Sequence, residues 1–109
     1  MRIAIIAPPW LPVPPPAYGG VEAVIDRLAR GFHAAGHDVL LCTTGDSTCP
    51  VPRRWTLPQA VSERMGRTLE ELRHVIGAYD AVQGCEIVHD HTLVGPMYAR
   101  AMPGLPVVT

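Results

Sequence analysis

Two histidines separated by one aspartate, His89-Asp90-His91, form the most chemically capable group in the sequence. They close the segment 86–92 (EIVHDHT), whose apolar start indicates a buried strand. Side chains alternate along a strand, so the two imidazoles are expected to point one way and Asp90 the other. An imidazole can bind a metal ion, or it can exchange hydrogen bonds with hydroxyl groups.

Three interpretations of this pair remain open from the residues alone. In the first, His89 is a hydrogen-bonded residue at a strand end and His91 is a solvated loop residue. In the second, the pair supplies two ligands to zinc, which requires a third ligand. His33, His37 and His74 lie on or beside predicted helices and show no matching spacing. In the third, the pair belongs to a polar cluster that binds sugar hydroxyl groups.

Two glycines, Gly19 and Gly20, stand where the segment 17–22 (AYGGVE) leads into a helical pattern. Glycine lets a backbone approach a ligand closely, and a helix N-terminus presents N–H groups that favour an anion such as a diphosphate. The alternative interpretation is that Gly19 and Gly20 only form a turn before the helix and bind no ligand. The dinucleotide fingerprint GxGxxG and the Gly-Lys-Ser/Thr loop are absent, and the chain has no lysine. These absences weaken the dehydrogenase and nucleotide-hydrolase interpretations.

The elements that must position these residues begin with a strand, a loop, a helix and a second strand. Residues 3–7 form a short apolar run closed by two prolines, as in a strand covered on both faces. Residues 8–20 contain six prolines and two glycines and predict a long loop, which in a compact domain is usually functional or disordered. Residues 21–35 predict a helix, Gly36 predicts its left-handed C-cap, and residues 38–43 predict the second strand.

The helix at residues 21–35 is predicted to be amphipathic. Its polar face carries most of the charged side chains, which are Glu22, Asp26, Arg27 and Arg30. The apolar face is predicted to contain Val21, Val24, Ile25, Leu28, Ala29 and Phe32.

The later elements continue the alternation of strands and helices. They are predicted as an edge-like strand at 51–57, a helix at 68–82, a strand at 85–89, a short helix at 93–101 and a strand at 105–109. Pro52 favours an edge position for the third strand. Thr68 and Glu71 have the spacing of a capping box.

This alternation predicts an α/β fold, a Rossmann-like parallel sheet with helices on both faces and strand order 3-2-1-4-5. In open α/β sheets, ligands bind at the carboxyl ends of the strands. The loop carrying Gly19 and Gly20 and the strand end carrying His91 should therefore meet at one edge.

The bulk properties exclude several classes of function. The 109 residues suffice for one domain, and the net charge of −1 provides no basic surface for nucleic acid. No apolar run approaches the roughly 18 residues of a membrane span. The apolar run after Arg2 is ended by Pro8, too early for a signal peptide. The odd set of cysteines, Cys42, Cys49 and Cys85, favours three reduced thiols and a cytoplasmic location.

The order of these features resembles the N-terminal, acceptor-side domain of family 4 glycosyltransferases. The features are a strand, a proline-rich loop, YGGVE opening a helix, and IVHDH closing a later strand, with the best matches at residues 1–45 and 85–94. The resemblance implies a GT-B architecture, in which two Rossmann-like domains face each other across a cleft. It also implies a retaining transfer of a sugar from a nucleotide-sugar donor to an acceptor hydroxyl.

The same resemblance implies roles for individual residues. Gly19 and Gly20 match the glycine loop near the donor diphosphate, with Tyr18 beside them. His91 matches the histidine near the transferred sugar, where it would position substrate and stabilise the transition state, and His89 is the second choice for that match. His89 is otherwise expected to bind substrate. No cofactor and no metal are implied. A metal-dependent hydrolase using His89 and His91, or a non-catalytic Rossmann-like binding module, are the alternatives.

The sequence is expected to be part of a longer enzyme. The run ending at Thr109 reads as a strand at its carboxyl edge, so residues 1–109 are predicted to be a partial N-terminal domain without the C-terminal donor-binding domain. The family's basic pair and E-x7-E element are missing from this chain, which is therefore expected to be inactive alone. An exposed outer strand predicts self-association. Peripheral membrane association would involve regions outside this chain.

Overall fold

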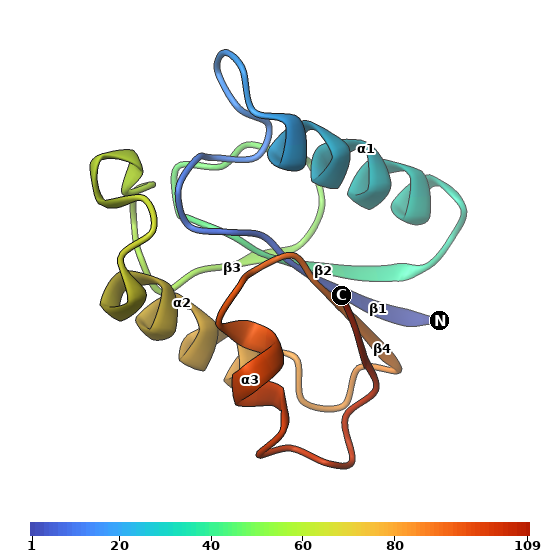
Figure 1. Ribbon diagram of the computed structural model, residues 1–109. Helices are drawn as coiled ribbons and strands as arrows, with labels where there is room; N and C mark the ends of the chain where they lie inside the picture. Colours follow the sequence, from blue (N-terminus) through green and yellow to red (C-terminus); the bar gives the residue numbers. More distant parts are fainter.

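The computed structural model describes residues 1–109 as a five-stranded parallel sheet flanked by helices (Figure 1). The elements are β1 Arg2–Ile6, α1 Gly20–Ala34, β2 Asp38–Cys42, β3 Arg53–Arg54, a 3-10 turn Ser62–Arg64, α2 Thr68–Ala81, β4 Ile87–Asp90, α3 Gly95–Ala99 and β5 Val107–Val108. The strand order is β3-β2-β1-β4-β5, and every neighbouring pair is parallel. The predicted α/β fold and strand order are confirmed.

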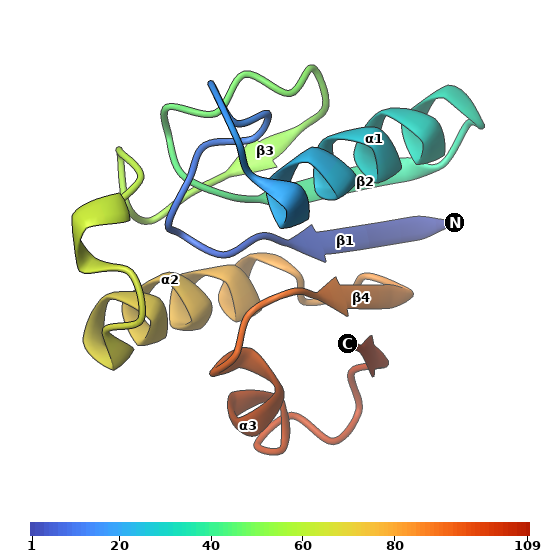
Figure 2. The ribbon, with the colours of Figure 1, turned by 45° about the horizontal axis from the view of Figure 1, so that its top comes forward.

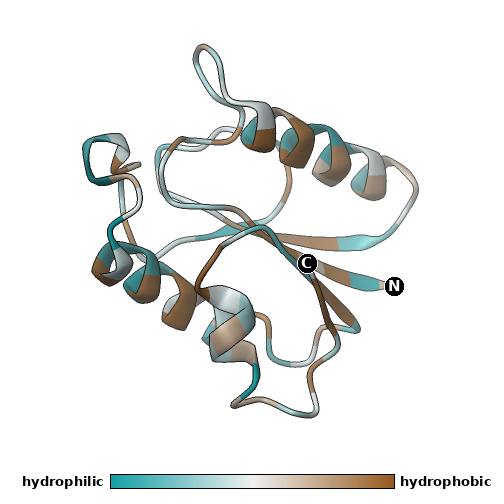
Figure 3. Cartoon of the chain, viewed as in Figure 1, coloured by the Kyte–Doolittle hydropathy of each residue, from teal (hydrophilic) through white to brown (hydrophobic).

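The central strand β1 is buried on both faces because helices cover both sides of the sheet (Figures 1 and 2). Ile3 and Ile5 pack with Ile25 and Ala29 of α1 on one face. Ala4 and Ile6 lie on the other face in a cluster that contains residues of α2, with residues of α3 packed against it. Apolar segments of the strands and helices therefore face the two interiors, as Figure 3 shows. This two-sided burial explains the continuous apolar run in the sequence.

The proline-rich loop between β1 and α1 is anchored through Val13. This side chain is buried with the cluster under α1. The Val13 N–H donates to Ser47 Oγ at 2.9 Å, and the Val13 carbonyl accepts from the N–H groups of Thr48 and Cys49, both at 2.9 Å. The loop is thus tied to the chain after β2, which fixes where α1 begins.

The third strand is much shorter than the predicted 51–57. Only Arg53–Arg54 pairs as a regular strand with β2. Single backbone bonds continue outside that range, from Leu41 N–H to Pro52 O and from Gly45 N–H to Leu57 O. Proline cannot donate to a ladder, so the flanking chain follows the sheet edge without forming a full strand. The other predicted elements differ from the observed ones by no more than two residues at either end.

The predicted capping box at the start of α2 is wrong. Arg67 occupies the N-cap position, Thr68 is already helical, and no side chain caps the helix. The Glu71 carboxylate instead bonds to backbone N–H groups in the chain after β4. The spacing of Thr68 and Glu71 fits a local cap, but the Glu71 carboxylate accepts its hydrogen bonds from a more distant part of the chain.

The polarity of the first turn of α1 also differs from the prediction. Val21 and Val24 are exposed, whereas Glu22 is buried with 5% of its surface accessible. The remaining pattern holds, with Ile25 and Ala29 fully buried. Gly36 follows the helix at φ +91°, which confirms the left-handed position predicted there.

Candidate functional site

The candidate site lies at the carboxyl edge of β1 and β4. These strands are neighbours, with Ile6 opposite Asp90, and the His91 N–H donates to the Ile6 carbonyl at 3.0 Å. His91 is therefore fixed beside the point where β1 gives way to the proline-rich loop. Figure 2 shows the start of α1 and the end of β4 at this same edge of the sheet. The structure thus places both predicted groups at one edge, although no hydrogen bond joins them.

The start of α1 leaves backbone donors available. The first bond of the helix runs from Ala23 N–H to Gly19 O at 2.9 Å, and no side chain caps the N-terminus. The preceding N–H groups, including that of Gly20, therefore have no partner within the chain. Together with the positive end of the helix dipole, they form a surface on which an anion can bind.

The two glycines at this start serve different purposes. Gly20 is exposed, and a Cβ there would meet only the Tyr18 hydroxyl, at 3.6 Å. Gly19 is buried, and a Cβ there would lie 2.9 Å from Leu11 Cδ1 and 2.9 Å from Pro15 Cβ. Gly19 is thus required for packing of the proline-rich loop, whereas Gly20 leaves open space in front of the helix.

Tyr18 is highly exposed, with 92% of its surface accessible. Its hydroxyl is the nearest side-chain group to the open space at Gly20. Its position beside the free N–H groups gives it access to anything bound there.

The histidine pair points the same way, as the strand alternation predicts. The His89 and His91 rings have centroids 4.1 Å apart and are tilted by 46°. Both residues are half-buried. Burial lowers the pKa of His91, the neighbouring His89 lowers it further, and Asp90 acts in the opposite direction. The ring is therefore neutral at neutral pH, with one donor and one acceptor nitrogen.

One nitrogen of His91 is left without a partner. Its Nε2 is buried and makes no hydrogen bond within the chain. A buried polar atom without a partner is costly, and its presence calls for an explanation such as strain, an ordered water or a role in catalysis. This atom, Nε2, belongs to His91, the residue predicted from the sequence to lie near the transferred sugar.

Asp90 points to the opposite face and holds the chain that follows β4. It is 2% exposed, and its Oδ1 accepts from the Thr92 N–H at 2.8 Å and the Thr92 hydroxyl at 2.7 Å. Its Oδ2 accepts from the Tyr79 hydroxyl at 2.6 Å, and burial together with this bond raises the pKa of Tyr79. A Cβ at Gly95 would overlap the Asp90 carboxylate, so only glycine allows α3 to begin here.

A second buried carboxylate, Glu71 of α2, supports the same turn. Its Oε2 accepts from the Leu93 N–H at 2.7 Å and the Val94 N–H at 3.2 Å. Glu71 and Asp90 therefore fix the backbone of residues 92–94, directly after His91. Reasoning from the sequence missed this function of both residues. The partners of Glu71 lie 22 and 23 residues away and leave no local signal, whereas the two-residue spacing from Asp90 to Thr92 is one that could have indicated a turn.

The chain contains no group of three His, Cys, Asp or Glu side chains arranged to hold a metal ion. The hydrolase alternative needs a third ligand beside His89 and His91, and residues 1–109 do not supply one.

Cys42, Cys49 and Cys85 are free thiols. Burial raises the pKa of Cys42 to about 12 and that of Cys49 to about 11, so these two thiols stay protonated. None of the helices has the length and apolar character needed to cross a membrane.

Comparison with known proteins gives one finding. The family model of Glycosyltransferase Family 4 matches residues 18–109, a range that includes Gly19, Gly20 and the histidine pair. No curated protein matches the chain. The match covers most of the chain and agrees with the α/β fold. The chain therefore belongs to glycosyltransferase family 4.

Proposed function

We propose that this chain is the acceptor-side, N-terminal part of a two-domain GT-B enzyme. The enzyme transfers a sugar from a nucleotide-sugar donor to an acceptor hydroxyl and retains the anomeric configuration. The observation that carries the proposal is that a neutral His91 directly follows the carboxyl end of β4. That strand adjoins β1, whose loop leads to the uncapped start of α1.

The donor diphosphate binds at the start of α1 in this proposal. The N–H of Gly20 and those following it donate to phosphate oxygens, and the open space at Gly20 allows close approach. Gly19 keeps the loop in place through its contacts with Leu11 and Pro15. Tyr18 lies next to the phosphates and supplies a hydroxyl.

His91 acts on the transferred sugar. Its neutral ring exchanges hydrogen bonds with sugar hydroxyl groups, and these bonds strengthen as charge develops in the transition state. His89 packs against it and restricts the ring orientation. The Asp90 and Glu71 carboxylates keep the neighbouring backbone rigid. Such preorganisation lets a donor act without rearrangement during the reaction.

The remaining donor contacts belong to a C-terminal domain in this proposal, so residues 1–109 alone do not catalyse transfer. The enzyme works in the cytoplasm, where its three free thiols stay reduced.

The test of this proposal compares two valine substitutions on the same helix of the full-length enzyme. Gly20→Val places a branched side chain over the free N–H groups, whereas Gly31→Val adds the same volume where nothing lies within 4 Å. Both glycines are exposed and neither has positive φ. Gly20→Val should weaken nucleotide-sugar binding by roughly tenfold or more, which corresponds to ~1.4 kcal/mol. Equal donor affinity in the two variants would reject the diphosphate site.

A further inference from the structure

Glu22 of α1 carries a buried carboxylate for which the chain provides no partner. The residue is 5% exposed, and its side chain takes part in none of the hydrogen bonds and ion pairs of the chain. A buried charge without a partner is costly. The other two buried carboxylates of this edge, Glu71 and Asp90, each accept from at least two donors. The donor that Glu22 lacks must therefore come from outside the chain.

The usual local roles of a glutamate at a helix start do not explain this burial. Glu22 is the third residue of α1, from which a capping-box side chain bonds back to the N-cap N–H, but the N–H of the N-cap Gly19 receives no such bond. A glutamate in the first turn also interacts favourably with the helix dipole, but an exposed carboxylate does so without losing its hydration. The buried position of Glu22 therefore needs a further reason.

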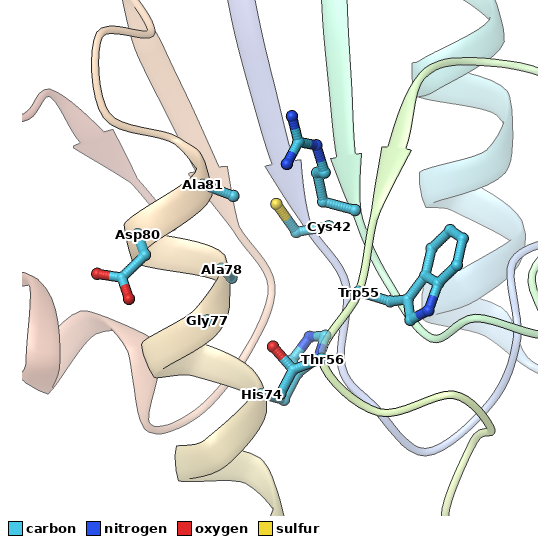
Figure 4. A pocket seen from close by; sticks show the side chains of 9 residues that line it. Cys42, Trp55, Thr56, His74, Gly77, Ala78, Asp80 and Ala81 are labelled. Carbon is cyan, nitrogen blue, oxygen red and sulfur yellow. The ribbon is translucent and has the colours of Figure 1, made fainter.

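The carboxylate of Glu22 remains open to a ligand. The side-chain atoms that are sealed from solvent and have no partner are Asp26 Oδ1, His74 Nδ1 and His91 Nε2. Neither oxygen of Glu22 is among them, so both can be reached from outside although most of the side chain is buried. His74 provides the contrast, because it lines the cleft between α2 and the chain after β3 (Figure 4) but its Nδ1 has almost no accessible surface there. That nitrogen cannot accept from a ligand, whereas Glu22 can.

Glu22 lies on the same side of the sheet as the histidine pair. It belongs to the buried face of α1, with Ile25 and Ala29, which pack on the sheet. Ile87 of β4 packs against the same cluster, and side chains alternate along a strand, so the histidine pair also faces this side. The Nδ1 of His91 is not sealed, unlike its Nε2. A carboxylate and an imidazole nitrogen, both without partners in the chain, are therefore accessible on one side of the same sheet edge.

The start of α1 thus combines two binding preferences. The N–H groups from Gly20 onward favour an anion, whereas the Glu22 carboxylate repels an anion and accepts from donors such as hydroxyl groups. A diphosphate joined to a sugar carries both kinds of group in one molecule. With the diphosphate at the N–H groups, the neutral sugar is the part that fits beside Glu22, and this fixes the direction in which the donor binds.

We propose that the Glu22 carboxylate accepts hydrogen bonds from hydroxyl groups of the transferred sugar. This inference rests on the proposed transfer function and adds a sugar-binding residue to that site. Glu22 and His91 hold the sugar from two elements, α1 and the chain after β4. The carboxylate also disfavours a donor that binds with a phosphate in the sugar position, so Glu22 determines specificity as well as affinity. No covalent bond forms or breaks at this residue.

The test compares nucleotide sugars with the same diphosphates lacking the sugar, by isothermal titration calorimetry of the full-length enzyme. The probes are UDP-glucose, UDP-N-acetylglucosamine, GDP-mannose and ADP-glucose, each with its nucleoside diphosphate. Glu22→Ala should weaken binding of the nucleotide sugar about tenfold or more, because it removes hydrogen bonds to a charged group. Binding of the diphosphate alone should not weaken, because its contacts to the helix N–H groups remain. Gly20→Val should weaken binding of both ligands.

Two further variants make the result specific. Glu22→Gln has nearly the same shape and keeps a carbonyl acceptor, so its loss of affinity should be smaller and again confined to the nucleotide sugar. This variant provides the test if Glu22→Ala is unstable. Glu63→Ala is the matched control, because it removes one negative charge from an exposed glutamate, and both affinities should be unchanged. The melting temperature of Glu22→Ala should change little, because alanine favours the helix and no hydrogen bond within the chain is lost.

The proposal is overturned if Glu22→Ala binds the nucleotide sugar as tightly as the unmodified enzyme does, which would mean that only water meets the carboxylate. It is also overturned if the nucleotide sugar and the diphosphate lose affinity equally, because the substitution would then act through the helix start. In both cases, weaker binding by Gly20→Val would leave the diphosphate site and the transfer function standing. An unmodified enzyme that binds none of the nucleotide sugars would reject the transfer function together with this inference.

Discussion

Asp90 and His91 adjoin in the chain but point to opposite faces of the sheet, and their environments differ accordingly. Asp90 is surrounded by donors from Thr92 and Tyr79, so its buried charge is compensated. His91 has a buried Nε2 without a partner and a pKa lowered by burial. The Asp90 carboxylate thus holds the backbone, while burial keeps the adjacent His91 imidazole neutral.

The lowered pKa values of His74 and His91 predict how stability depends on pH. Burial is the main cause in both residues. Below the ordinary histidine pKa of about 6.5, the unfolded chain binds protons that the folded chain resists. The free energy of unfolding should therefore fall as pH drops from about 7.5 to about 5.

Urea unfolding at a series of pH values measures this dependence. In His74→Gln, the side-chain amide can still donate to Ala7 O but cannot titrate, so the decline in stability should be smaller. A chain that is equally stable at both ends of this pH range would contradict the assignment of two buried neutral histidines.

At the scale of elements, the turn between β4 and α3 is fixed by groups that come from α2. Glu71 accepts from the N–H groups of Leu93 and Val94, and Tyr79 donates to Asp90. The start of α2 points to the carboxyl edge of the sheet (Figure 2), where these bonds form. The helix therefore supports the backbone beside His91 as well as covering the sheet.

Replacing Glu71 with alanine should loosen this turn. The substitution leaves two N–H groups without acceptors, at a cost of about 1–3 kcal/mol in the free energy of unfolding. Amide hydrogen exchange at Leu93 and Val94 should become faster. Glu71→Gln is the matched control, because its carbonyl oxygen can still accept, and it should keep most of the protection. Unchanged exchange in the alanine variant would show that Glu71 does not hold the turn.

Local patterns in the sequence were sufficient to predict the fold at this scale. The two-sided burial of β1 and the helical period of α1 and α2 produce apolar spacings that specify strands, helices and their order. The edge strand β3 was predicted too long, because backbone bonds around Pro52 follow the sheet without a full ladder. The hydrophobic period of a segment does not show how many residues of an edge strand form ladder hydrogen bonds with the neighbouring strand.

The candidate site was only partly predictable. Strand alternation correctly placed the two imidazoles together, and strand order placed them at the edge shared with Gly20. The partners of Glu71 lie 22 and 23 residues away, so a local motif suggested a cap that does not exist. The burial of Glu22 was missed for a related reason, since the face a helix buries depends on what packs against it.

At the scale of the whole molecule, both outer strands are short. β3 and β5 contain two residues each, and Val108 of β5 is 46% exposed. The outer edge of β5 pairs with no further strand. Exposed backbone groups at a sheet edge pair readily with another chain.

The isolated 109-residue chain should therefore self-associate. Sedimentation velocity from about 10 μM to about 1 mM should show a species whose mass increases with concentration. Val108→Lys places a charge on the edge and should reduce this association. A chain that remains monomeric over the whole range would contradict the prediction.

The central claim is that His91 acts on the transferred sugar at an edge that the rest of the molecule keeps rigid. The most direct test measures kcat for sugar transfer by the full-length enzyme together with its melting temperature. His91→Ala should lower kcat by about 10²–10³-fold, as removal of one preorganised hydrogen-bonding group typically does. The melting temperature should change little, because the His91 ring makes no hydrogen bond within the chain. His33→Ala, at an exposed position on α1, should retain full activity. A His91→Ala enzyme with normal kcat, or one whose lost activity is matched by a large fall in melting temperature, would contradict the account.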